Sequence, residues 1–252
     1  MTELQTNELL KQYAVTYETR DFLKGDPSWF MHQVSGEANQ EAMAFIASGI
    51  SYGSRKQFLP KIDWMRQQAG GEIDVWIREG RYANVLPSDA NDCFYRLQTK
   101  SCMNKFLHSY QLLLDKYDSL GSYLRHQSGG HVMTALQAVE QITNWFALHG
   151  SGGVIPKNAQ SACKRVCMFL RWMVRTDSPV DLGLWSDFID RSSLIMPLDT
   201  HVMQQACKLG LLKSRTTSMS TALRLSDVMN TIFPGDPLRG DFALFGYGVN
   251  NQ

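Results

Sequence analysis

The stretch CKRVCMFLRWMVR, residues 163–175, decides what kind of protein this chain forms. It is apolar almost all round a helical wheel, and a helix of that kind is buried in a protein core. Four cations interrupt the pattern, and three of them, Lys164, Arg171 and Arg175, fall at i, i+7 and i+11 on one face. The stretch therefore predicts a buried helix with one basic face.

This basic face has two interpretations. Residues 177–199 follow it with five aspartates and one arginine, so internal ion pairs would satisfy Arg171 and Arg175, which would be very costly to bury unpaired. The alternative is that both arginines line a cleft. Lys164 differs from them, because it stands at the start of the helix, where the helix dipole disfavours a cation. Lys164 is therefore the better candidate for a functional role.

Helical periodicity continues through the rest of the chain and predicts an all-α fold. Apolar residues recur every three or four positions in the stretches 58–65, 102–117, 132–146 and 222–232. Alternating β patterns are scarce, and the nearest, residues 74–77, is too short to build a sheet on. We expect a single two-lobed helical bundle over residues 1–252, with a lobe boundary near 150–160, where the glycines of 150–153 break the pattern.

Composition excludes several classes of protein. The 252 residues carry 25 Lys and Arg against 24 Asp and Glu, so a strongly basic nucleic-acid coat is absent, although a local patch is compatible with this balance. The N-terminus does not look like a signal peptide and no apolar run is long enough for a membrane span. Five cysteines without a CxxC pair argue against a disulfide framework or a zinc knuckle. We expect a cytoplasmic protein with no cofactor and no metal.

A second segment, PLDTHV at residues 197–202, contains the main candidate for a catalytic residue, Asp199. Asp199 comes directly before a helical apolar run that ends near Gly210, which is the position of an N-cap. Capping alone would explain an aspartate here, and it is worth about 1 kcal/mol.

The same segment resembles a motif of the helix-hairpin-helix DNA glycosylases, the endonuclease III-like group. The resemblance rests on PLDTHV, on the Leu-Gly-Leu of residues 209–211, on DFALFGYG at 241–248 and on AFIASGIS at 44–51. It implies the two-lobed fold of those enzymes and makes Asp199 the catalytic carboxylate. Over nearly the whole chain, CKRVCMFLRWMVR, VDLGLW, PLDTHV and DPLRGDFALFGYG together resemble a bacterial family known as domain of unknown function 2400.

The glycosylase hairpin, which cradles a DNA phosphate, is altered in this chain. The corresponding residues 152–157 do not keep the glycine spacing of that hairpin. Some glycosylases carry a Schiff-base lysine at the start of the next helix. Lys164, 35 residues before Asp199, holds a similar place, and Arg165 and Lys157 are rival assignments.

The resemblance implies a DNA glycosylase-like protein that binds nucleic acid, with DNA the expected form, and that is a candidate for excising a damaged base, with lyase activity if Lys164 attacks the sugar. In this interpretation Asp199 stabilises the positive charge that builds on the sugar. The expected nucleic-acid contacts are Lys157, Arg165, Ser51, Tyr52, Arg55 and His201. Trp172, Tyr52 and Phe245 are candidates for holding a flipped base, although such aromatics are more often core residues. The alternative is a non-catalytic module of the same fold that binds nucleic acid or protein.

Two further motifs carry less weight. Residues 49–53 match the GxSxG pattern of serine hydrolases, but that pattern needs a strand before it, and a helical pattern precedes it here. Asp199 and His201 could ligate a metal, but two ligands on one helical turn need partners that the sequence does not offer.

Overall fold

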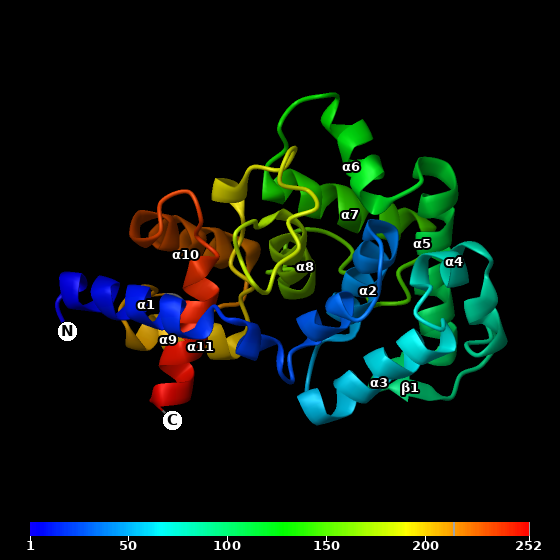
Figure 1. The fold of residues 1–252 in the computed structure, drawn as a ribbon, viewed down its shortest axis with the longest axis horizontal. Coiled ribbons are helices and arrows are strands. Elements are labelled where there is room, and N and C mark those ends of the chain that lie inside the picture. Colours follow the sequence, from blue (N-terminus) through cyan, green and yellow to red (C-terminus); the bar gives the residue numbers. More distant parts are fainter. Residues whose placement is uncertain (214, 252) are drawn as a thin grey trace. The chain divides into compact units, whose positions relative to one another are not determined.

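The computed structural model describes residues 1–213 and 215–251, and the chain divides into two compact units. The first unit contains residues 1–24, 132–139 and 159–252, and the second contains 25–131 and 140–158. Both units are mainly helical (Figure 1), which confirms the all-α prediction.

The first unit is built around α8. Its elements are α1 (Glu3–Tyr17), η1 (Arg20–Leu23), the start of α7 (Ala135–His149), α8 (Lys164–Val174), η4 (Arg191–Ser193), α9 (Thr200–Lys208), α10 (Met219–Ile232) and α11 (Arg239–Asn250). From Val166 to Arg175 every residue of this stretch except Met168 is buried, as its composition predicts. The following loop folds back over the end of α8, where the amides of Leu182 and Trp185 donate to carbonyls in its last turn.

Helices α1, α9 and α11 lie side by side in this unit (Figure 1). Glycines of α11 make the close approach possible, because a Cβ at Gly246 would overlap the Tyr17 ring and one at Gly248 would lie 2.6 Å from His201 Nε2. The N-terminal and C-terminal helices of the chain therefore belong to one packed layer.

The second unit is built around α2, whose residues 41–50 are all buried. Its elements are η2 (Pro27–His32), α2 (Glu37–Ile50), α3 (Arg55–Gln68), α4 (Ile73–Arg78), η3 (Arg81–Asn84), β1 (Cys93–Tyr95), β2 (Gln98–Thr99), α5 (Lys100–Tyr117), α6 (Leu120–Ser128) and the rest of α7. Glu41 is the buried carboxylate of α2, and it accepts from the amides of Leu120 (2.8 Å) and Gly121 (3.1 Å) at the start of α6.

The local expectations need one correction. Residues 74–77, judged too short to build a sheet on, do lie in a helix, α4, and the strands of the described residues are the short antiparallel pair β1 and β2. The apolar stripe expected from residue 132 begins later, because α7 starts at Ala135 and Val132 is 69% exposed in front of it. The expected lobe boundary stays a prediction; one break between the two units falls after Asn158.

Candidate functional site

Asp199 is the N-cap of α9, as predicted. The five residues before it are buried, and the Met196 amide donates to Ser226 Oγ of α10 at 2.8 Å, which fixes the segment that delivers Asp199. The backbone of Asp199 is extended, and its Oδ1 atom accepts from the Val202 amide at 2.8 Å. The cap uses one carboxylate oxygen and leaves the other to face a partner.

That partner is Lys164. Its Nζ atom lies 2.7 Å from Asp199 Oδ2, across 35 residues of sequence. About a third of each side chain is exposed, 36% for Lys164 and 35% for Asp199. The two residues chosen from separate sequence motifs therefore form one ion pair in the first unit, and a solute can reach it.

The charge of Lys164 controls the protonation of Asp199. Burial raises the pKa of the Asp199 carboxyl, but the Lys164 charge, the hydrogen bond from Lys164 and the bond from the Val202 amide act against it, so the pKa lies below its usual range. Asp199 is therefore ionised at neutral pH and can stabilise a positive charge that develops beside it.

Asp241, in the first turn of α11, extends the pair into a cluster. It is bonded to Arg171 of α8. Burial raises the pKa of Asp241, while the charges of Arg171 and Lys164 act to lower it and that of Asp199 adds to the rise. Asp241 was not expected as a site residue, although it opens the DFALFGYG motif. The sequence signal for it is an acid in the first turn of a helix, directly before the buried residues 242–244.

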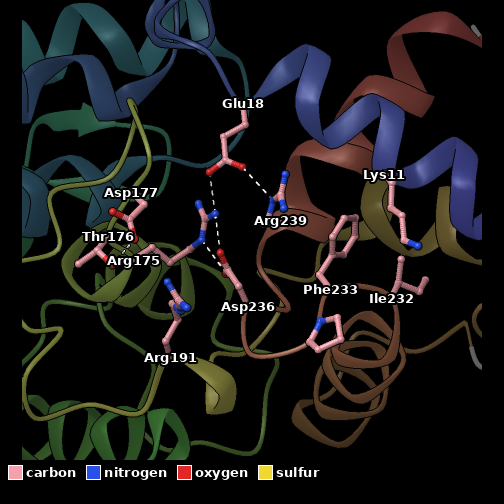
Figure 2. A pocket seen from close by; sticks show the side chains of 11 residues that line it. Lys11, Glu18, Arg175, Thr176, Asp177, Arg191, Ile232, Phe233, Asp236 and Arg239 are labelled. Atoms are coloured by element: carbon pink, nitrogen blue, oxygen red, sulfur yellow. Dashed lines mark hydrogen bonds and ion pairs between the residues drawn. The ribbon is translucent and has the colours of Figure 1, made fainter.

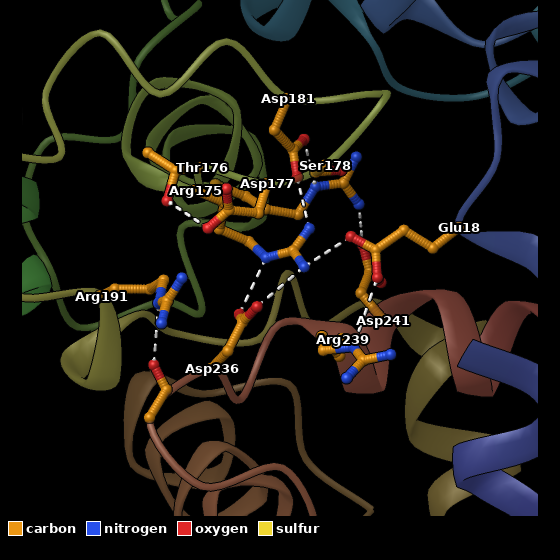
Figure 3. Close-up of polar contacts among 12 residues, drawn as sticks. Glu18, Arg175, Thr176, Asp177, Ser178, Asp181, Arg191, Asp236, Arg239 and Asp241 are labelled. Atoms are coloured by element: carbon orange, nitrogen blue, oxygen red, sulfur yellow. Dashed lines mark hydrogen bonds and ion pairs between the residues drawn. The ribbon is translucent and has the colours of Figure 1, made fainter. Parts of the chain in front are cut away.

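Arg171 and Arg175 pair internally. Asp181 is fully buried and accepts from Arg171 Nε at 3.2 Å and from Arg175 Nη1 at 2.5 Å. Arg175 also contacts Asp236 (2.8 Å) and Glu18 (2.6 Å), as Figure 3 shows. Burial acts to lower the pKa of Arg175, but these carboxylates raise it, so the guanidinium stays charged. The basic face of α8 is thus a row of ion pairs with Lys164 at its more exposed end.

The first turn of α8 also lacks a side-chain cap. Its N-cap residue Cys163 has a left-handed backbone (φ 43°) and makes no side-chain capping bond. Arg165 is half-buried beside Lys164 on this turn. Amides at a helix N-terminus attract anions, and this turn lies next to the ion pair.

His201 is an exposed residue in the first turn of α9, where its charge helps to lower the pKa of Asp199 and its ring packs on Gly248. It therefore lies beside the ion pair.

The other expected nucleic-acid contacts, Lys157, Ser51, Tyr52 and Arg55, belong to the second unit. Lys157 is exposed, and Arg55 lies 3.5 Å from Asp26. Ser51 is buried at the end of α2 and donates to the Ala47 carbonyl at 2.6 Å, so its hydroxyl proton is already used. This geometry also lacks the strand that a GxSxG nucleophile needs.

Of the aromatic candidates for a base pocket, Trp172 is fully buried in the core. Tyr52 packs against Tyr95, and Phe245 packs against Tyr17 and Phe22. Trp172 is thus unsuitable for stacking on a base, whereas the half-buried rings of Tyr52 and Phe245 keep some exposed surface.

Two searches of the described residues bear on other classes of site. No group of three or more His, Cys, Asp and Glu side chains in residues 1–213 and 215–251 is arranged to hold a metal ion. Over the same residues, no helix combines the length and the apolar composition needed to cross a bilayer.

Comparison with known proteins gives a family for this chain. No curated protein and no solved structure matches it. A family model does match, over residues 26–250, which include α8, the Lys164–Asp199 pair and α11. The chain therefore belongs to the family described as "Protein of unknown function (DUF2400)".

Proposed function

We propose that this protein acts on nucleic acid as a glycosylase-like enzyme, with Lys164 and Asp199 as its reactive pair. The observation that carries the proposal is the 2.7 Å contact between Lys164 Nζ and Asp199 Oδ2 at a solvent-accessible position. Breaking an N-glycosidic bond builds positive charge on the sugar, and a fixed carboxylate next to it lowers that barrier. The ionised Asp199 supplies such a carboxylate.

Lys164 is the nucleophile of the proposed reaction. Its amine attacks C1′ of the sugar, the bond from C1′ to the base breaks, and the base leaves with the electron pair and takes up a proton. Loss of the ring C1′–O4′ bond then gives an imine between Lys164 and the sugar. In the resting pair the amine lies 2.7 Å from the Asp199 carboxylate, so Lys164 must give up a proton before it can attack.

We expect the binding of nucleic acid to neutralise only a few phosphates. Lys164 and Arg165 flank the uncapped first turn of α8, and Lys157 is a further exposed cation in the second unit. Each neutralised phosphate contributes about −0.9 to the slope of log K against log salt. We therefore expect weak binding to duplex or single-stranded DNA, with a slope of about −2 to −3.

Base release from oligonucleotides that carry a panel of lesions tests the catalytic role. Asp199→Asn keeps an N-cap, because Asn caps about as well as Asp, but it should lose about 100-fold or more in rate. Asp227→Asn, at an exposed position on α10, is the matched control and should keep the rate. Equal rates in the two variants would remove Asp199 from the chemistry.

A non-catalytic nucleic-acid- or protein-binding module is the second candidate, and one observation favours it. Both carboxylate oxygens of Asp199 already have partners, the Val202 amide and Lys164, and in this second interpretation the pair holds α9 against α8. In that case DNA binding would occur with no base release, and Asp199→Asn would change stability alone.

A further inference from the structure

A polar cavity of about 500 Å³ lies in the first unit, on the Arg175 side of the ion-pair row (Figure 2). Cations from three separate elements line it: Lys11 from α1, Arg191 from η4 and Arg239 from α11. We propose that this cavity binds the phosphoryl group of a small organic phosphate. The proposal does not rest on the glycosylase-like function.

Two guanidinium groups on the cavity wall have terminal nitrogens that no described residue uses as donors. Arg191 donates through Nε to the Gly235 carbonyl at 3.1 Å, and no carboxylate of the described residues lies within ion-pair distance of it. Arg239 faces Glu18 through Nε at a long 3.4 Å. In both side chains the two terminal nitrogens are therefore available, and a pair of terminal guanidinium nitrogens is suited to phosphate oxygens.

The acids on the cavity wall do not cancel these cations. Glu18 and Asp236 are both bonded to Arg175, which is 1% exposed and already surrounded by carboxylates. Asp177 accepts from the Thr176 hydroxyl at 3.3 Å on the exposed rim. Four cations of the cavity wall thus stand against three carboxylates, which leaves one net positive charge for a ligand.

The shape and the chemistry favour an organic phosphate over a small carboxylate. A phosphate monoester carries close to two negative charges and three acceptor oxygens, which match the two guanidinium forks. Lys11, on the cavity wall, is paired with Glu8 at 3.0 Å, so it adds to the local charge and is not counted as a free donor. The volume lies in the range of sites for small molecules. Ile232, Phe233 and Pro234 form an apolar wall on which the organic part can pack, and Arg239 already lies over the Phe233 ring at 5.6 Å.

Calorimetric titration of the full-length protein with inorganic pyrophosphate and with ATP tests the proposal. Both should bind, whereas adenosine and sodium sulfate at equal ionic strength should not. Arg191→Gln should weaken binding by about tenfold or more, since a hydrogen bond to a charged group is lost. Arg224→Gln makes the same charge change at an exposed position of α10 and should bind like the unmodified protein.

Circular dichroism of both variants first establishes that they are folded. A single-stranded oligonucleotide then separates the two sources of a phosphoryl group. Binding of the oligonucleotide but not of pyrophosphate or ATP, with loss in Arg191→Gln, would identify a backbone phosphate as the ligand. Equal affinities in Arg191→Gln and Arg224→Gln, or no binding of any phosphate, would overturn the proposal.

Discussion

Asp181 is the residue on which the arrangement of α8 most depends. Its carboxylate is fully buried and bonded to two buried guanidinium groups, those of Arg171 and Arg175. Removing its charge leaves both cations with less compensation in a place where water cannot replace it. We therefore expect this side chain to matter more for stability than any exposed acid.

The Asp181→Asn substitution should lower the free energy of unfolding by about 3–5 kcal/mol, the usual loss when a buried ion pair is broken from one side. Urea denaturation measures it. Asp227→Asn, on the exposed side of α10, should stay within about 0.5 kcal/mol of the unmodified protein. A loss below about 1 kcal/mol in Asp181→Asn would mean that the cluster is hydrated and contributes little.

The Lys164–Asp199 pair should show its effect at acidic pH. The folded-state pKa of Asp199 lies below its unfolded value of about 3.9. The stability from this group is thus fully present above that unfolded value, and it is lost as the pH falls through the lower folded pKa. Because the pair is partly exposed, its contribution should be no more than about 1 kcal/mol.

Urea midpoints of the unmodified protein and of Asp199→Asn, measured from pH 7 to pH 2, test this. The difference between them should be constant from pH 7 to about pH 5 and shrink below about pH 4. A difference that already disappears between pH 7 and pH 5 would contradict the ion pair.

At the scale of elements, the loop that follows α8 fixes the charged row. Leu182 and Gly183 donate to the Trp172 carbonyl, and this turn holds Asp181 against α8. Gly183 has a left-handed backbone (φ 69°), and a Cβ there would lie 2.9 Å from Thr176 Cγ2 and 3.0 Å from the Arg175 carbonyl. The turn therefore needs glycine for its conformation and for its space.

Gly183→Ala should destabilise the protein through both effects, and Gly210→Ala separates them. Gly210, after α9, has a similar φ of 75°, but no atom lies within 4 Å of a Cβ added there. Both changes cost the left-handed conformation, about 1–3 kcal/mol, and Gly183→Ala should lose at least about 1 kcal/mol more through the clash. Equal losses by urea denaturation would show that the loop moves away freely.

The sequence predicts several of the helices and part of the candidate site. Periodicity predicts α3, α5 and α10 because each buries one apolar face, and it predicts the cap at Asp199 because an N-cap is a local signal. The sequence does not predict the hairpin of β1 and β2, because strands of three and two residues are too short to show an alternating pattern.

The carboxylate partners of Arg171 and Arg175 also differ in whether the sequence predicts them. Asp181 could be proposed because it lies near Arg171 and Arg175 in sequence. Asp236 and Glu18 could not, because they are 61 and 157 residues from Arg175 and only tertiary packing brings them together.

For the whole molecule, the two units differ in how the chain builds them. Residues 25–158 contain all of the second unit together with residues 132–139 of the first, whereas residues 159–252 lack α1 and the start of α7, which belong to the first unit. In the full chain, α1 packs on α11 through ring contacts such as Tyr13 with Tyr247 and Tyr17 with Phe245. Without α1, this face of α11 is exposed to water.

We therefore expect a fragment of residues 25–158 to unfold cooperatively, and a fragment of residues 159–252 to lack a cooperative transition. Circular dichroism during thermal unfolding distinguishes the two. Cooperative unfolding of the 159–252 fragment alone would show that α1 is dispensable to the core around α8.

The most direct test of the glycosylase-like account is borohydride trapping on an oligonucleotide that carries an abasic site. If Lys164 forms an imine with C1′, reduction will link the protein covalently to the DNA. The account predicts trapping in the unmodified protein and in Lys157→Ala, and none in Lys164→Ala. Trapping that persists in Lys164→Ala, or no trapping of the unmodified protein on abasic and damaged oligonucleotides alike, would contradict it.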